Sequence, residues 1–121
     1  MVNQLLCGVH LAAAAEALVL ARKAGLDQAQ VLDIVSHSAA SSWMLRERAP
    51  RMVARGFDEL HSALAILVKD MGIVLDGASA VGAPTPLAAA ARELYKAGQA
   101  MGLGDADDSG LIRVFERLAG L

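Results

Sequence analysis

The first 24 residues constrain the fold more than any other segment, because they are almost continuously apolar. They include the run LAAAAEALVLA at 11–21, and alanine and leucine are among the strongest helix formers. Gly25 follows, and glycine is the residue that most often ends a helix in the left-handed conformation. We therefore predict a helix from the N-terminus to Ala24. Because it is apolar on nearly every side, we expect it at the centre of the domain.

The composition of this segment also resembles a membrane span or a signal peptide. However, Asn3, Gln4, His10 and Glu16 interrupt it, and no basic stretch precedes it. We predict a core helix and no membrane association.

The rest of the chain favours helices as well. Apolar residues make up 55% of the 121 residues and aromatic residues only 3%, so alanine, leucine, valine, isoleucine and methionine must form the core. No stretch shows the alternation and β-branched enrichment of a strand. We predict one all-α domain of about six helices over residues 1–121, which is short for a complete cofactor-dependent enzyme.

Local signals mark the next two helices. Asp27 and Gln30 form a capping box for the second helix. Ser41 or Ser42 can cap a third helix, and Pro50 should end or bend it.

Turn residues separate the remaining helices. A long helix is expected at roughly 58–81, and GAPTP at 82–86 divides it from a fifth helix with Pro86 in its first turn. Gly102 and Gly104 should end the fifth helix, and the last helix follows an acidic cluster.

Charge and cysteine content limit the partners and the setting. With 11 basic and 13 acidic residues the formal net charge is -2, which gives no basic field for nucleic acid. Cys7 is the single cysteine, so no intrachain disulfide is possible, and we expect a reducing, cytoplasmic setting.

A charged pair, Lys69 and Asp70, interrupts the apolar segment HSALAILVKDMGIVL at 61–75. At about 100° per residue, Ser62 and Lys69 point the same way on a helix, whereas Asp70 shares its flank with small or apolar residues. Asp70 should therefore be the more enclosed of the pair, and a buried carboxylate needs a partner. The spacing alone leaves two interpretations open, a functional site or a structural pair.

Two amides, Asn3 and Gln4, begin the first helix. Asn3 shares its face with Cys7 and His10, and Gln4 shares its own with Gly8. A glycine one turn from an amide leaves room for a ligand or for another helix. The alternative is a frayed helix end.

The segment GLGDADDSGLIRVFE at 102–116 partly matches a calcium loop. Asp105, Asp107 and Glu116 fall at positions 1, 3 and 12 of an EF-hand. Against this, glycines break the entering helix, and an acidic cluster before a helix is also explained by the helix dipole. The three histidines show no metal-ligand spacing, so we predict no metal site from them.

Taken in order, four segments carry a resemblance to a known family: MVNQLL, AEALVLARKAGLD, LVKDMGIVLDGASAVGAPTPL and ELYKAGQAMGLGDADDSGLI. The chain resembles the C-terminal helical domain of the β-hydroxyacid dehydrogenases, the relatives of 3-hydroxyisobutyrate and 6-phosphogluconate dehydrogenases. The HSAL…VKD segment is most similar to the L-threonate dehydrogenase branch.

The resemblance implies an architecture and a reaction. Such enzymes join an N-terminal Rossmann domain, which binds NAD or NADP, to this helical domain, and the active site lies between the two. The family's catalytic lysine belongs to a K-x-x-N-N motif and would precede Met1. We therefore expect no catalytic residue, no tightly bound cofactor and no activity in this chain alone, which would serve as the substrate-side and oligomerisation domain.

The resemblance also implies roles for individual residues. Asn3 and Gln4 match the two amides of the lysine motif and would bind the substrate, although the second is glutamine rather than asparagine. Ser62 would be a further substrate contact that suits a polyhydroxylated acid. Lys69 and Asp70 match the family's lysine–aspartate pair and would contact the cofactor.

These expectations leave three hypotheses. The first is part of an NAD(P)-dependent 3-hydroxyacid dehydrogenase that oxidises a small hydroxy acid such as 3-hydroxyisobutyrate or L-threonate. The second is a free-standing helical interaction or dimerisation module, and the third is a calcium-binding domain. The long apolar helices also predict self-association as a homodimer or a higher oligomer.

Overall fold

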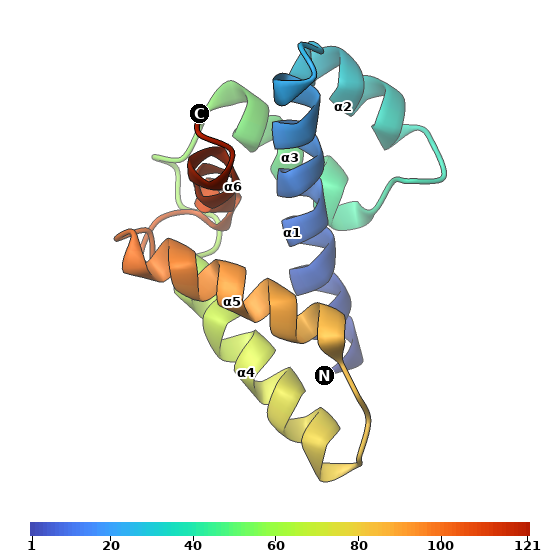
Figure 1. Cartoon of the computed structure of the whole chain (residues 1–121), viewed down its shortest axis with the longest axis vertical. Coiled ribbons are helices and arrows are strands. Elements are labelled where there is room, and N and C mark those ends of the chain that lie inside the picture. The colour runs from blue at the N-terminus through green and yellow to red at the C-terminus, as the bar shows by residue number, and fades with distance from the viewer.

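Six α-helices and one short 3₁₀ helix form the computed structural model, which describes all residues 1–121 (Figure 1). The helices are α1 (Val2–Lys23), α2 (Gln28–Ser36), α3 (Trp43–Ala54), α4 (Leu64–Ala80), α5 (Pro86–Ala100), η1 (Asp108–Leu111) and α6 (Ile112–Leu118). There is no sheet, and one isolated backbone bridge joins Ala63 to Asp107. The predicted all-α fold of about six helices is confirmed.

Helix α1 is the central element, as its apolar sequence predicts. It contacts each of the other helices, and α5 crosses it at a steep angle (Figure 1). Leu11, Ala15 and Leu18 are almost completely buried along its length. By length and composition alone α1 could cross a membrane. Here it is instead the core helix of a bundle.

Three predicted helix boundaries are confirmed by their local geometry. Gly25 follows α1 with φ of +75°. The Asp27 carboxylate accepts the backbone N–H of Gln30 at 2.8 Å at the start of α2. The Ser42 hydroxyl accepts the N–H of Leu45 at 3.0 Å at the start of α3.

The prediction that Pro50 could end the third helix is wrong. Pro50 lies inside α3, which continues to Ala54. Proline removes one helical hydrogen bond, but its neighbours Ala49 and Met52 are fully buried in the core. Their packing holds the segment in helical register.

The predicted start of the fourth helix is also wrong, because α4 begins at Leu64 and not near residue 58. The backbone N–H groups of His61 and Ser62 donate to Oδ1 of Asp107, at 2.9 and 3.3 Å. The N–H of Leu64 donates to the carbonyl of Ala106 at 3.0 Å. The acidic turn therefore holds this backbone in a non-helical connection.

Asp107 is fully buried and surrounded by donors. Arg51 donates to it at 3.1 Å, and the hydroxyl and N–H of Ser109 donate as well. Burial alone would raise the pKa of this carboxyl. The hydrogen bonds from Ser109, from the His61 amide and from Arg51 outweigh it and lower the pKa from 3.8 to about 2.

Two other buried carboxylates are also paired with arginines. Asp108 accepts Nε of Arg48 at 3.2 Å, and burial raises its pKa despite this cation. Glu116 accepts Arg22 at 3.0 Å and Arg55 at 2.6 Å. These arginines join the C-terminal segment to α1 and α3.

The geometry contradicts the calcium-loop hypothesis. Two acidic positions of the loop, Asp107 and Glu116, are buried and paired with arginines, whereas a calcium ion needs free carboxylate oxygens. The acidic cluster is a structural feature of the fold.

Helices α1 and α4 pack closely through glycine. A Cβ atom on Gly8 would lie only 2.6 Å from the thioether of Met71, which is fully buried.

The Tyr95 hydroxyl donates to the Gly8 carbonyl at 2.6 Å. Burial, reinforced by Asp108 and Cys7, raises the pKa of Tyr95 well above its ordinary value and keeps it a donor. The room beside Gln4 is therefore filled by another helix.

Replacing Gly8 by alanine should lower the free energy of unfolding by about 1–3 kcal/mol, because the buried Met71 must move to accommodate the methyl group. Urea unfolding followed by circular dichroism measures the effect. Gly56→Ala is the matched control, since a Cβ atom there meets nothing within 4 Å. Equal stability of the two variants would contradict the close packing.

Candidate functional site

The amide of Gln4 and the charged pair of α4 form one polar cluster. Nε2 of Gln4 donates to Oδ2 of Asp70 at 2.6 Å, and Nζ of Lys69 lies 3.7 Å from Oδ1. The side chain of Asp70 is 14% exposed and that of Lys69 is 67% exposed. The expectation that Asp70 is the more enclosed is confirmed. The result is a fixed carboxylate beside a largely exposed ammonium.

Packing between the helices explains why these side chains meet. Gly8 lies one turn after Gln4, and its contact is Met71, the residue next to Asp70. Met1 similarly packs against Gly77 of α4. The first turn of α1 is therefore seated on α4 and not frayed. Close approach at the two glycines brings Gln4 within reach of Asp70.

Asn3 extends the cluster along α1. Its Nδ2 donates to Oε1 of Gln4 at 2.7 Å and to Sγ of Cys7 at 3.5 Å. It also lines a cleft of about 330 Å³ between α1 and the start of α3. The other residues that line this cleft are Leu6, Cys7, His10, Ser41, Ser42, Trp43 and Met44. Asn3 therefore connects the charged pair to this cleft.

Sequence reasoning missed the α3 side of this cleft. It treated Ser41 and Ser42 only as helix caps, and did not consider Trp43. Trp43 is 58% exposed, with the guanidinium of Arg48 lying 5.5 Å from its ring centroid. A single exposed tryptophan is a signal that could have identified this wall, because large aromatic side chains are enriched at binding surfaces.

The structure does not bring Ser62 into the cluster. The predicted alignment with Lys69 assumed a continuous helix, but Ser62 precedes the first residue of α4. Its N–H donates to Asp107, and its carbonyl accepts the N–H of Asp108 at 2.7 Å. The helical argument for Ser62 is wrong, because its backbone is part of the acidic turn.

The histidines do not gather with other ligands. His37 bonds the carbonyl of Asp33 at 2.8 Å, His61 lies 3.5 Å from Glu59, and His10 lines the cleft. No group of three histidine, cysteine, aspartate or glutamate side chains is close enough to share a metal ion.

The chemistry of the cluster is that of binding and orientation. An exposed ammonium attracts a phosphate or a carboxylate, while a fixed carboxylate and two amides orient hydroxyl or amide groups. These groups fit a contact with one end of a dinucleotide or with a hydroxy acid. They do not form a complete dinucleotide site. Such a site holds the pyrophosphate on a strand, glycine-rich loop and helix unit, and these residues form helices only.

The fold and the cluster together define an all-helical domain with a charged cluster and an adjacent cleft at the N-terminal end of α1. Residues 1–115 match the family described as the NAD-binding domain of NADP-dependent 3-hydroxyisobutyrate dehydrogenase. The chain belongs to this family, and the resemblance to the β-hydroxyacid dehydrogenases is confirmed.

Individual relatives agree with the family. The chain is 44% identical over 115 residues to L-threonate dehydrogenase from Cupriavidus necator. The aligned residues make up 95% of this chain and 38% of that protein. It is 43% identical over 115 residues, with the same coverage, to L-threonate dehydrogenase from Escherichia coli K12. The chain therefore spans about two fifths of the length of these relatives.

A solved structure has the same fold. The 3-hydroxyisobutyrate dehydrogenase from Salmonella typhimurium superposes with a TM-score of 0.90 at 42% identity, covering 93% of this chain and 39% of the other.

Proposed function

We propose that this chain is the substrate-side domain of an NAD- or NADP-dependent 3-hydroxyacid dehydrogenase, with residues 1–121 packing against a separate Rossmann domain. The observation that carries the proposal is the hydrogen-bonded cluster of Gln4, Asp70 and Lys69, in a chain whose family is NAD-binding. Lys69 is exposed beside the fixed carboxylate of Asp70 in the otherwise largely apolar helix α4. A charged ligand bound next to the N-terminal end of α1 would explain this pair.

Each residue of the cluster has a role in this proposal. Lys69 attracts the negative charge of the cofactor or of the substrate carboxylate. Asp70, held by Gln4, accepts hydrogen bonds and orients the bound groups. The nicotinamide supplies the hydride acceptor. The family resemblance implies a lysine of the K-x-x-N-N motif as the general base.

The substrate we propose is a small polyhydroxylated acid such as L-threonate. Support comes from the relatives named above and from three polar side chains in the cleft next to Asn3, since His10, Ser41 and Ser42 can bind hydroxyl groups. 3-Hydroxyisobutyrate has a single hydroxyl group and a methyl branch, so it offers fewer hydrogen-bond partners to these side chains. We still propose Ser62 as a substrate contact, but only the family resemblance supports this role.

A cytoplasmic, self-associating enzyme is also part of the proposal. The free thiol of Cys7 is half-buried and unpaired by a disulfide, which suits a reducing compartment. Several large apolar side chains remain exposed on the bundle, Leu20, Leu87 and Leu118 among them. Exposed apolar surface of this kind favours association between copies.

A chimeric enzyme tests the proposed reaction. In it, this chain replaces the segment of the Escherichia coli L-threonate dehydrogenase with which it aligns. We expect the chimera to reduce NAD or NADP with L-threonate, with kcat/KM at least about tenfold higher than with 3-hydroxyisobutyrate. A folded chimera that reduces neither cofactor with either acid would refute the activity. A preference for 3-hydroxyisobutyrate would refute only the substrate class.

A further inference from the structure

His10 lies at the junction of two hollows on one side of α1. The cleft of about 330 Å³ next to Asn3 includes His10, Ser41 and Ser42, and the same three residues line a second hollow of about 420 Å³. The two hollows therefore form one recess along α1. Beyond the three shared residues, the second hollow is lined only by apolar side chains: Ala13, Ala14, Ala17, Val35, Ala39, Ala40 and Leu45.

His10 is also the polar side chain of this recess that has no partner. The Asn3 amide donates to two side chains of α1, Ser41 accepts a hydrogen bond from Arg46 at 2.8 Å, and Ser42 caps α3. The half-buried imidazole of His10 makes no side-chain hydrogen bond and no ion pair. A neutral imidazole can donate one hydrogen bond and accept another, which matches the two capacities of a hydroxyl group.

The spacing of His10 from Asn3 fits the length of a four-carbon acid. The two residues are seven apart, so they share one face of α1 and lie about 10 Å apart along its axis. The amide nitrogen of Asn3 already donates within α1, which leaves its carbonyl oxygen to accept a substrate hydroxyl. A ligand that makes a hydrogen bond of about 3 Å at each end must span the remaining distance of about 4 Å, the length of an extended four-carbon chain.

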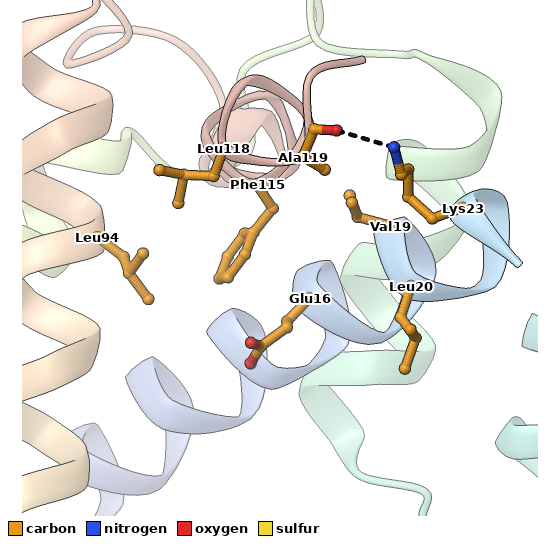
Figure 2. A pocket seen from close by; sticks show the side chains of 8 residues that line it. All are labelled: Glu16, Val19, Leu20, Lys23, Leu94, Phe115, Leu118 and Ala119. Carbon is orange, nitrogen blue, oxygen red and sulfur yellow. Dashed lines mark hydrogen bonds between the residues drawn. The ribbon is translucent and has the colours of Figure 1, made fainter.

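The other large hollow on α1 does not suit such a ligand. It has a volume of about 410 Å³, and Figure 2 shows Leu94, Phe115 and Leu118 around it. The ammonium of Lys23 on its rim already donates to a backbone carbonyl at 3.1 Å (Figure 2). A polyhydroxylated acid bound there would place hydroxyl groups beside apolar side chains and its carboxylate near that of Glu16, and both contacts are unfavourable.

We propose that His10 determines substrate specificity by hydrogen bonding to the terminal hydroxyl of a four-carbon polyhydroxylated acid such as L-threonate. This inference rests on the proposed function, and it names the residue that distinguishes such an acid from one without the terminal hydroxyl. A longer polyhydroxylated acid would extend past His10 and place its additional hydroxyl groups against alanines, where they find no partners. The recess is therefore matched to the four-carbon length.

Paired ligands and paired variants test this role in the chimeric enzyme. The ligands are L-threonate and 2,3-dihydroxybutanoate of the same configuration, which lacks only the terminal hydroxyl. We expect KM for L-threonate to be about tenfold lower than KM for the analogue, the upper range for one neutral hydrogen bond, with similar kcat. His10→Leu should raise KM for L-threonate about tenfold and leave KM for the analogue unchanged. His10→Gln keeps a donor and an acceptor and should recover most of the preference.

His37→Leu is the matched control, because the His37 side chain is 80% exposed and lines neither hollow. It should change neither KM. Calorimetry without oxidised cofactor measures the same preference as a ratio of dissociation constants and needs no turnover. A chimera that binds L-threonate more tightly through His10 but does not oxidise it would keep this proposal and refute only the activity.

Three results would overturn the role of His10. The first is equal binding of the two acids by the parent chimera, and the second is no binding of either. The third is a His10→Leu variant that changes the binding of both acids equally or of neither, because His10 would then make no contact specific to the terminal hydroxyl.

Discussion

Replacing Asp107 by alanine should lower the free energy of unfolding by about 3–5 kcal/mol, the range measured when one partner of a buried ion pair is removed. The substitution leaves Arg51 without its carboxylate and the backbone amides of His61 and Ser62 without an acceptor. It therefore releases α3 and the connection before α4 at the same time. Urea unfolding followed by circular dichroism measures the loss.

Asp105→Ala is the matched control for this prediction. Asp105 lies two residues earlier in the same acidic cluster but is exposed, so its removal should change stability by less than about 0.5 kcal/mol. Similar losses in the two variants would show that general acidity near the last helix, and not the buried network, stabilises this segment.

The same network should make the protein sensitive to acid in a defined range. The pKa of Asp107 is about 2 in the folded state, against an ordinary value of 3.8. Its contribution to stability is therefore complete above about pH 4 and is lost as the pH falls toward 2. Burial raises the pKa of Asp108, which opposes this trend. We expect the stability difference between wild type and Asp107→Asn to shrink over that range in urea titrations.

Replacing Asp70 by alanine in the chimeric enzyme should lower kcat/KM for L-threonate by about 100-fold, the scale expected when a positioning group is lost. The change removes the acceptor that holds Gln4 at 2.6 Å and the carboxylate beside Lys69. Initial rates of NAD(P)H formation measure the effect.

Asp76→Ala is the control for Asp70, because Asp76 is exposed on the same helix and makes no ion pair. It should keep kcat/KM within about threefold of the parent chimera, since surface changes away from a site have small effects. If both variants retained full activity with unchanged melting temperatures, Asp70 would have no role in the reaction.

Local signals in the sequence predicted much of the secondary structure. The caps at Asp27 and Ser42 and the left-handed Gly25 depend on neighbours only three or four residues away, so they can be recognised without the fold. The enclosure of Asp70 relative to Lys69 follows from helical spacing alone. For the same reason the shared face of Asn3 and Cys7 was predicted correctly.

The remaining features depend on contacts between distant segments. Nothing near residue 58 indicates that the Asp107 carboxylate, more than 40 residues later, would delay the start of α4. Pro50 is tolerated in α3 because of buried neighbours that propensity does not describe. The spacing left open whether Gly8 makes room for a ligand or a helix, and only the packing of Met71 decided between them.

The central claim is that the Gln4–Asp70–Lys69 cluster faces the bound cofactor and substrate. A crystal structure of the chimera with NAD and L-threonate tests it most directly. We expect a polar atom of Lys69 or Asp70 within hydrogen-bonding distance, about 3 Å, of one of the two ligands. Both ligands bound elsewhere, with the cluster open to solvent, would contradict the account.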